Sequence, residues 1–281
     1  MKYLLILCIF TSFVFAKINI AVSIIPQKEF VEKIAGEKAN VFAIVKPGSS
    51  PHTYEPKPSE LKEISEAKIY FPIKIEFENT WLDKFATQNK EMKIVEMTKG
   101  VNFITMKKHK HQDGKEKTII KPDPHTWTSA LNVRIMAKTI YETLIEVDAQ
   151  NKDFYKNNYL NFLDEINLTD KRIREILIDV KNNSKFMVFH PAWGYFARDY
   201  ALVQFPVEIE GKEPKPKELI KIIEEAKKEN IKAIFTQSEF STKTAQTIAD
   251  SLNIKVLKET PLAEKWSENL IKMANAIANN Y

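Results

Sequence analysis

Glycine, cysteine and histidine are scarce in this 281-residue chain, which holds six, one and five of them respectively. The glycines stand too far apart to form G-x-G-x-x-G or G-x-x-x-x-G-K, so both glycine-rich phosphate-binding loops are excluded. The single cysteine is Cys8, which excludes a disulfide framework and a cysteine-based metal cluster. A content of 44% hydrophobic and 28% charged residues is nevertheless typical of a folded globular protein.

Beyond the first sixteen residues the sequence has no apolar run long enough to span a membrane. The apolar stretch 3–15 follows a single lysine and is itself too short to cross a bilayer as a helix, and Val14-Phe15-Ala16 resembles a signal-peptidase site. We therefore expect residues 1–16 to be a signal peptide that is cleaved after Ala16. A buried first strand or a membrane anchor is the alternative. Leu7 precedes Cys8 where lipid attachment needs a small residue, so we expect no lipid anchor.

The chain also lacks a strong excess of either charge. With 42 basic and 37 acidic residues its formal charge is +5, which falls to +4 when the lysine of the signal peptide is removed. Both signs are interspersed, as in the segment 224–229, which is typical of a solvated surface and not of a nucleic-acid-binding stripe. We expect no nucleic-acid partner.

From residue 17 onward, β-branched apolar segments alternate with segments of helical spacing. This alternation predicts an α/β fold of parallel sheets with helices on both faces. A longer helical segment at 153–181 is expected to be a rigid strut between two such lobes. The predicted organisation is an N-terminal lobe at 17–147, a connecting long helix at 148–183 and a C-terminal lobe at 184–281. Strands are expected at 17–24, 40–45, 67–71, 93–95, 185–189, 201–207, 231–235 and 254–257, with further helices at 27–35, from Pro58, and at 129–146, 193–200, 216–230, 241–253 and 264–279.

Three of the five histidines stand beside prolines and near expected strand or helix ends. His52 follows the strand 40–45, His190 ends a strand of the C-terminal lobe, and His125 comes shortly before a helix. Ligands bind outside the carboxyl ends of strands in open parallel sheets, and proline reduces the entropy lost on ordering a site. Because neutral imidazole is the commonest metal ligand, we expect the three rings to converge on Zn²⁺. A hydrogen-bonded core or helix-cap role for each histidine is the alternative.

The segment 105–124 is polar and without periodicity, which predicts a mobile surface loop. His109 and His111 lie within it. Two readings stay open for this pair: a weak patch that gathers metal ions, or a charged and solvated loop without a metal.

Three segments carry a resemblance to a known family: 48–59 (GSSPHTYEPKPS), 123–127 (DPHTW) and 189–197 (FHPAWGYFA). In these motifs, in their order and separation, in the long connecting helix and in the histidine-bearing insertion before Asp123, the chain resembles the metal-specific periplasmic solute-binding proteins of ABC importers, in their zinc-uptake branch. The likeness covers essentially the whole chain after residue 16.

The resemblance implies that His52, His125 and His190 are metal ligands in a cleft between the lobes of a periplasmic, monomeric protein. It also implies delivery of the ion to a membrane permease that is driven by a cytoplasmic ATPase. Manganese-type relatives tend to carry a carboxylate where this chain has His190, so a third nitrogen ligand favours Zn²⁺ over Mn²⁺. The chain departs from the family at Thr260, where an aspartate often supplies a fourth ligand. Water, Glu259 or a loop histidine (His109 or His111) are then the candidates for that position.

Two functions are compatible with such a site. The first is a binding protein that captures Zn²⁺ without catalysis and loads an ABC permease. The second is an exported zinc hydrolase, in which an open position on a three-histidine zinc activates water. A hydrolase needs a general base, for which Glu55 or Glu259 is available, but the sequence contains neither H-E-x-x-H nor G-x-S-x-G. The sequence therefore favours the binding protein.

Overall fold

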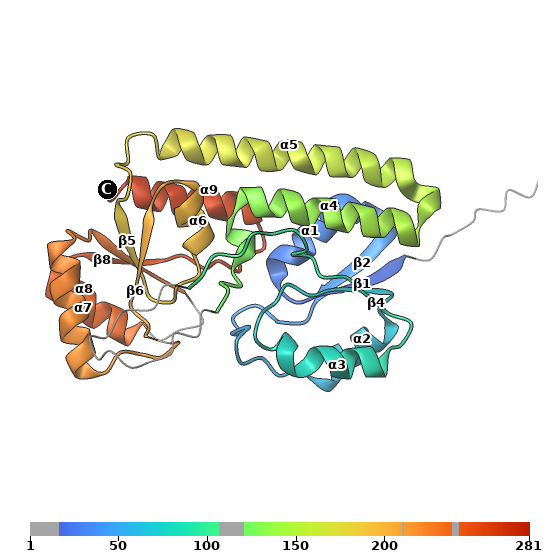
Figure 1. Ribbon diagram of the computed structural model, residues 1–281, viewed down its shortest axis with the longest axis horizontal. Helices are drawn as coiled ribbons and strands as arrows, with labels where there is room; N and C mark the ends of the chain where they lie inside the picture. The colour runs from blue at the N-terminus through green and yellow to red at the C-terminus, as the bar shows by residue number, and fades with distance from the viewer. Residues whose placement is uncertain (1–16, 107–120, 210, 238–241) are drawn as a thin grey trace, which may run out of the picture.

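The computed structural model describes residues 17–106, 121–209, 211–237 and 242–281. Two parallel four-stranded sheets with helices packed around them confirm the expected α/β architecture (Figure 1). The strand orders are β2-β1-β3-β4 in the N-terminal sheet and β6-β5-β7-β8 in the C-terminal sheet. The strands are β1 (Ile18–Val22), β2 (Ala39–Ala43), β3 (Ile69–Phe71), β4 (Lys93–Ile94), β5 (Lys185–Val188), β6 (Val203–Pro206), β7 (Ala233–Thr236) and β8 (Lys255–Lys258).

Nearly all of the predicted helices are present in the structure. One α-helix was missed, α3 (Glu78–Gln88), because its buried positions are only Glu78 and Phe85 and its apolar periodicity is weak. Residues 1–16 and most of the expected surface loop, including His109 and His111, lie outside the described residues. The helices are α1 (Ile25–Ala35), α2 (Pro58–Glu66), α3, α4 (Ala130–Val147), α5 (Lys152–Ile176), α6 (Gly194–Asp199), α7 (Pro216–Lys228), α8 (Lys243–Leu252) and α9 (Trp266–Ala278), with 3₁₀ turns η1 (Gly36–Lys38), η2 (Thr126–Thr128) and η3 (Ala149–Asn151).

Local sequence signals set several helix ends. Pro58 occupies the first turn of α2, where the missing N–H of proline is no loss. Ser129 caps α4, because its Oγ accepts a hydrogen bond from the backbone N–H of Asn132 at 3.1 Å. Gly36 ends α1 with φ at +52°, a conformation that favours glycine, and an added β-carbon there would lie 2.9 Å from Cζ of Phe154 and would have to displace that ring.

The 25-residue helix α5 is about 37 Å long and runs along both lobes (Figure 1). It packs against α1, α4 and α9, so it contacts helices from both halves of the chain. It ends at Ile176, five residues before the predicted end, because residues 177–180 turn away from helical geometry. Within the described part of the chain, none of the helices combines the length and the apolar character that spanning a membrane requires.

One continuous hydrophobic core connects the two sheets. It includes Val22 and Phe71 from the N-terminal sheet together with Phe186 and Phe235 from the C-terminal sheet. A second cluster, which includes Met187, Ile222 and Ile248, lies between the C-terminal sheet and helices α7 and α8. A shared core of this kind opposes large movements of one lobe against the other.

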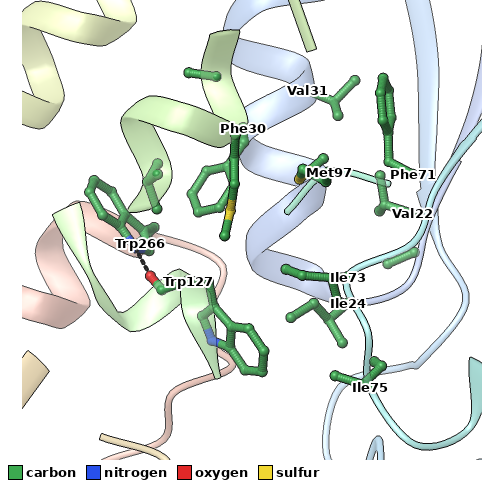
Figure 2. Packing of buried hydrophobic residues seen from close by; sticks show 14 of the residues in the cluster. Val22, Ile24, Phe30, Val31, Phe71, Ile73, Ile75, Met97, Trp127 and Trp266 are labelled. Carbon is green, nitrogen blue, oxygen red and sulfur yellow. Dashed lines mark hydrogen bonds between the residues drawn. The ribbon is translucent and has the colours of Figure 1, made fainter. Parts of the chain in front are cut away.

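Two tryptophans join the lobes within this core, as Figure 2 shows. The indole N–H of Trp266 donates to the carbonyl oxygen of Trp127 at 2.7 Å, and the indole N–H of Trp127 donates to the carbonyl oxygen of Pro261 at 2.8 Å. Phe30 of α1 meets Trp266 edge to face, with ring centroids 5.6 Å apart. The 3₁₀ turn η2, which follows His125 directly, is thereby tied to the chain segment between β8 and α9.

Candidate metal centre

The rings of His52, His125 and His190 come together between the two sheets. The Nε2 atom of His190 lies 3.0 Å from Nε2 of His52 and 3.2 Å from Nε2 of His125. One ligand atom from each ring lies within 4.8 Å of the others, which makes these three residues a possible metal-holding group in the described part of the chain. The predicted convergence of three histidines that are far apart in sequence is therefore present.

Each histidine is placed by the end of an element of secondary structure. His52 lies in the loop between β2 and α2, His190 comes two residues after β5, and His125 directly precedes η2. Because a residue following β2 contacts a residue following β5, the carboxyl ends of the two sheets face each other. This is the edge at which open parallel sheets bind ligands.

A carboxylate holds the other ring nitrogen of each histidine. In a neutral imidazole, an Nδ1–H group that donates to a carboxylate fixes the tautomer, so Nε2 carries a lone pair and no proton. Asp123 also accepts a hydrogen bond from the backbone N–H of His125 at 2.9 Å. The pairs are His52 Nδ1 with Glu76 Oε2 at 2.7 Å, His125 Nδ1 with Asp123 Oδ1 at 2.8 Å and His190 Nδ1 with Glu208 Oε2 at 2.7 Å.

Three unprotonated Nε2 atoms that face one point fit a tetrahedral metal ion. At a Zn–N distance of 2.0–2.1 Å, two nitrogens in a tetrahedral site lie about 3.3 Å apart, close to the separations of 3.0 and 3.2 Å measured here. When no cation or proton lies between them, two nitrogen lone pairs at these distances repel each other. A cation at their meeting point replaces this repulsion by attraction, so the donor set suits a metal ion.

The surroundings shift the pKa values of His190 and Glu76. Burial lowers the pKa of His190 from its usual 6.5 to about 4, although the hydrogen bond to Glu208 acts in the opposite direction. Burial acts to raise the pKa of Glu76, but the hydrogen bond and charge of His52 outweigh it and lower that pKa to about 2. At neutral pH His190 is therefore neutral, as metal binding requires of a ligand, and Glu76 is ionised.

The remaining walls of the pocket are mostly apolar. Ile75, Trp127 and Leu262 line it together with the three imidazoles, and Trp127 is only 1% exposed. Gln237 adds an amide, whose Nε2 donates to the carbonyl oxygen of His190 at 3.0 Å. An apolar wall excludes water and strengthens the electrostatic interactions of a bound ion.

Of the candidates for a fourth ligand, Glu259 is described by the structure and does not join this group. Glu259 pairs with Lys272 of α9, with 2.9 Å between Oε2 and Nζ, and its side chain is 8% exposed. Thr260 accepts a hydrogen bond from the backbone N–H of Leu262 at 3.1 Å. The loop histidines, His109 and His111, fall in a stretch that the structure does not describe.

Sequence reasoning missed the carboxylate partners and Gln237. Glu208 comes two residues after β6, Gln237 comes one residue after β7, and Glu76 lies in the loop after β3. All three therefore follow carboxyl ends of parallel strands, the same signal that pointed to His52 and His190. Asp123 stands two residues before His125, so its role was visible in the local motif.

Two α/β lobes along one long helix, with three carboxylate-backed imidazoles between them, define a two-lobed metal-binding protein. The family model described as ZnuA, zinc-uptake complex component A, periplasmic, matches residues 20–281. The chain belongs to this family. It is a metal-binding solute-binding protein of ABC-type metal uptake and not an enzyme, so the hydrolase alternative is set aside.

Relatives of known name agree with this assignment but differ in their metal. The chain is similar to a crystal structure of ZnuA, with a TM-score of 0.87, 40% identity and coverage of 94% of this chain and 99% of that chain. It is 26% identical to the high-affinity zinc uptake system protein ZnuA of Bacillus subtilis, over 85% of this chain and 76% of the relative. It is 29% identical to the manganese ABC transporter substrate-binding lipoprotein PsaA of Streptococcus mitis, over 89% of this chain and 86% of the relative.

Proposed function

We propose that this protein captures Zn²⁺ between its lobes, with His52, His125 and His190 as ligands, and delivers it to an ABC permease for uptake. The observation that carries the proposal is the set of three Nε2 atoms whose Nδ1 partners are all carboxylates. Imidazole nitrogens suit zinc, whereas manganese prefers carboxylate, carbonyl and water oxygens. A relative named for zinc uptake and one named for manganese both match the chain, and the all-nitrogen donor set is our reason for choosing zinc.

Capture proceeds by exchange of the hydration shell of the ion for imidazole nitrogens. Each ring is already oriented by its carboxylate, so little side-chain freedom is lost when the ion arrives. The carboxylates also supply negative charge just outside the ligands, which balances the divalent ion. We propose a division into lobes at 17–147 and 184–281, joined by the segment 148–183, with the ion held where the two lobes meet.

Zinc titration of the purified protein in competition with a chelator of known affinity tests this proposal. We expect His52→Ala, His125→Ala and His190→Ala each to lower zinc affinity by at least 100-fold, because each removes one of three ligands. Glu165→Gln is the control. Glu165 lies on α5 and pairs with Lys33, with 2.7 Å between Oε2 and Nζ, so this change should leave affinity within about twofold of the parent. Unchanged affinity in all three histidine variants would remove the proposal.

The metal preference needs a separate measurement. We expect Zn²⁺ to displace Mn²⁺ from the protein at equal concentrations, because three nitrogen ligands and an apolar wall offer manganese few oxygens. Competition dialysis followed by elemental analysis measures this preference. Retention of manganese in the presence of equimolar zinc would assign the protein to manganese uptake instead.

We further propose export through residues 1–16, with cleavage after Ala16, to give a soluble periplasmic monomer without a lipid anchor. The short apolar stretch with its small-residue end supports cleavage, and Leu7 before Cys8 argues against lipidation. Mass spectrometry of the protein isolated from the exported fraction tests both points. A mature N-terminus at Lys17 is expected, whereas a lipid-modified Cys8 would contradict the proposal.

A further inference from the structure

The loop 72–77, between β3 and α3, carries the carboxylate that orients His52. Its apolar side chains Ile73, Ile75 and Phe77 are 0%, 1% and 3% exposed, and Figure 2 shows Ile73 and Ile75 among the core residues around Ile24. The side chain of Glu76 is 45% exposed by contrast. Because burial does not hold the Glu76 side chain, the position of its carboxylate depends on the backbone of the loop.

That backbone is held from the interior of the lobe by Glu78, which is 4% exposed. Its Oε1 accepts a hydrogen bond from the N–H of Ile73 at 2.9 Å, and its Oε2 accepts one from the N–H of Lys74 at 2.7 Å. The hydroxyl of Ser23, at the end of β1, also bonds to Oε1 and lies 2.8 Å from the hydroxyl of Tyr70. Glu78 therefore connects the loop to both β1 and β3.

The loop needs this support because one of its residues is strained. Lys74 has φ at +68°, in the left-handed region that residues other than glycine adopt rarely and at an energetic cost. Its N–H bonds to Glu78, and its Nζ lies 2.9 Å from Oε1 of Glu96. Without the buried acceptor, the turn at Lys74 would relax and the loop would move together with Glu76.

We propose that Glu78 is a positioning residue for metal capture, because it fixes the loop 72–77 so that Glu76 can hold the ring of His52 with Nε2 toward the ion. Glu78 does not contact the ligands, and its effect passes through Glu76. This inference rests on the proposed function, in which His52 is a ligand. It adds a residue that is defined by its contacts to the backbone and not by its proximity to the metal.

A double-mutant cycle on zinc affinity tests the inference. We expect Glu76→Gln to lower affinity by about 10-fold or more, as for other partners of ligating histidines. Glu78→Gln keeps the size of the side chain but replaces one acceptor by a donor, and we expect a loss of about fivefold or more. If Glu78 acts through Glu76, adding Glu78→Gln to Glu76→Gln should change affinity by less than about twofold. Losses that multiply in the double variant would overturn the inference.

A metal-free readout separates this inference from the proposed function. In NMR spectra of the apo protein, we expect the Nδ1–H proton of His52 to be protected from exchange by its bond to Glu76. The Glu78→Gln variant should lose that protection, while the Nδ1–H proton of His190 keeps it. If the parent fails to bind zinc, the proposed function falls. If the parent binds zinc but the His52 signal and the affinity are unchanged in Glu78→Gln, only the positioning role falls.

Two further variants distinguish a specific effect of Glu78 on zinc affinity from a general loss of stability. Ser23→Ala removes one bond to Glu78 without touching the loop, and we expect a smaller loss of affinity that also vanishes in the Glu76→Gln background. Asp148→Asn is the matched control, since that carboxylate accepts bonds from Tyr155 and Asn151. Asp148 lies at the C-terminal end of the 18-residue helix α4, the end opposite to η2 and His125. This substitution should lower stability and leave zinc affinity unchanged. A loss of affinity in Asp148→Asn equal to that in Glu78→Gln would contradict a specific role for Glu78.

Discussion

Gly194 and Asp123 approach each other so closely that no side chain fits between them. A β-carbon added to Gly194 would lie 2.6 Å from Oδ2 of Asp123 and 3.1 Å from Cδ1 of Ile104. The other oxygen of the same carboxylate, Oδ1, holds Nδ1 of His125 at 2.8 Å. The glycine at the start of α6 thus leaves the space that the partner of His125 occupies.

We predict that Gly194→Ala lowers zinc affinity by about 10-fold, because the added methyl group displaces Asp123 and with it the ring of His125. Gly194 is helical and lacks a positive φ, so the backbone itself accepts alanine. Titration against a competing chelator measures the effect. Gly100→Ala is the control: φ there is +92°, and the new β-carbon would lie 3.5 Å from Cγ2 of Ile135, an ordinary contact, so stability should fall without loss of affinity. Equal affinity in Gly194→Ala and the parent would contradict this account.

The three carboxylate partners differ in burial, and this sets the order of their effects. The side chains of Asp123 and Glu208 are 2% and 4% exposed, whereas that of Glu76 is 45% exposed. Charge interactions are stronger away from water, so we predict that Asp123→Asn and Glu208→Gln lower zinc affinity more than Glu76→Gln does. All three losses should lie within about 10- to 100-fold. The same competition titration ranks them, and a largest loss for Glu76→Gln would be inconsistent with this reasoning.

Most of the fold could be predicted from the spacing of apolar residues, because buried parallel strands and amphipathic helices differ in that spacing. The bounds predicted for the strands and for helices α1, α2, α4 and α6 to α9 are close to the bounds observed in the structure. The end of α5 was placed too late, because Leu177 and Val180 continue the apolar spacing of the helix although they lie in hydrogen-bonded turns that follow Ile176. Counting apolar residues cannot tell a helix from the hydrogen-bonded turns that follow it.

Only part of the candidate metal site could be predicted from the sequence. The histidines stand next to prolines at strand or helix ends, and that local pattern predicted them. The pairing of His190 with Glu208 depends on β5 lying next to β6, and the pairing of His52 with Glu76 depends on β2 and β3 flanking β1. Strand order is a property of the whole sheet, so these pairs could not be predicted from one sequence.

The protonation of His190 should occur at an unusually low pH. Its pKa lies near 4 because burial disfavours the charged ring. The unfolded chain binds this proton near pH 6.5 and the folded chain only near 4, so the contribution of His190 to stability is present above 6.5 and is lost as pH falls toward 4. An NMR titration of the apo protein should give a midpoint below 5 for this ring. A midpoint near 6.5 would contradict the buried, neutral state described here.

The effect of pH on the contribution of Glu78 to the free energy of unfolding should be opposite to that of His190. Burial raises the pKa of Glu78 from 4.5 to about 7, so its contribution is fully present below pH 4.5 and is lost as pH rises through 7. A shift of this size corresponds to on the order of 3 kcal/mol. We predict that the parent loses stability relative to Glu78→Gln between pH 5 and pH 7.5, as measured by urea unfolding of the apo proteins at both values. Parallel behaviour of the two proteins across that range would show that Glu78 titrates normally.

The position of the bound ion can be determined by X-ray diffraction from crystals of the zinc-loaded protein, with anomalous data at the zinc edge. We expect one strong peak about 2.0–2.1 Å from the Nε2 atoms of His52, His125 and His190, with all three Nδ1 atoms still bonded to their carboxylates. A zinc ion that contacts fewer than two of these rings, or that binds elsewhere in the protein, would contradict this expectation.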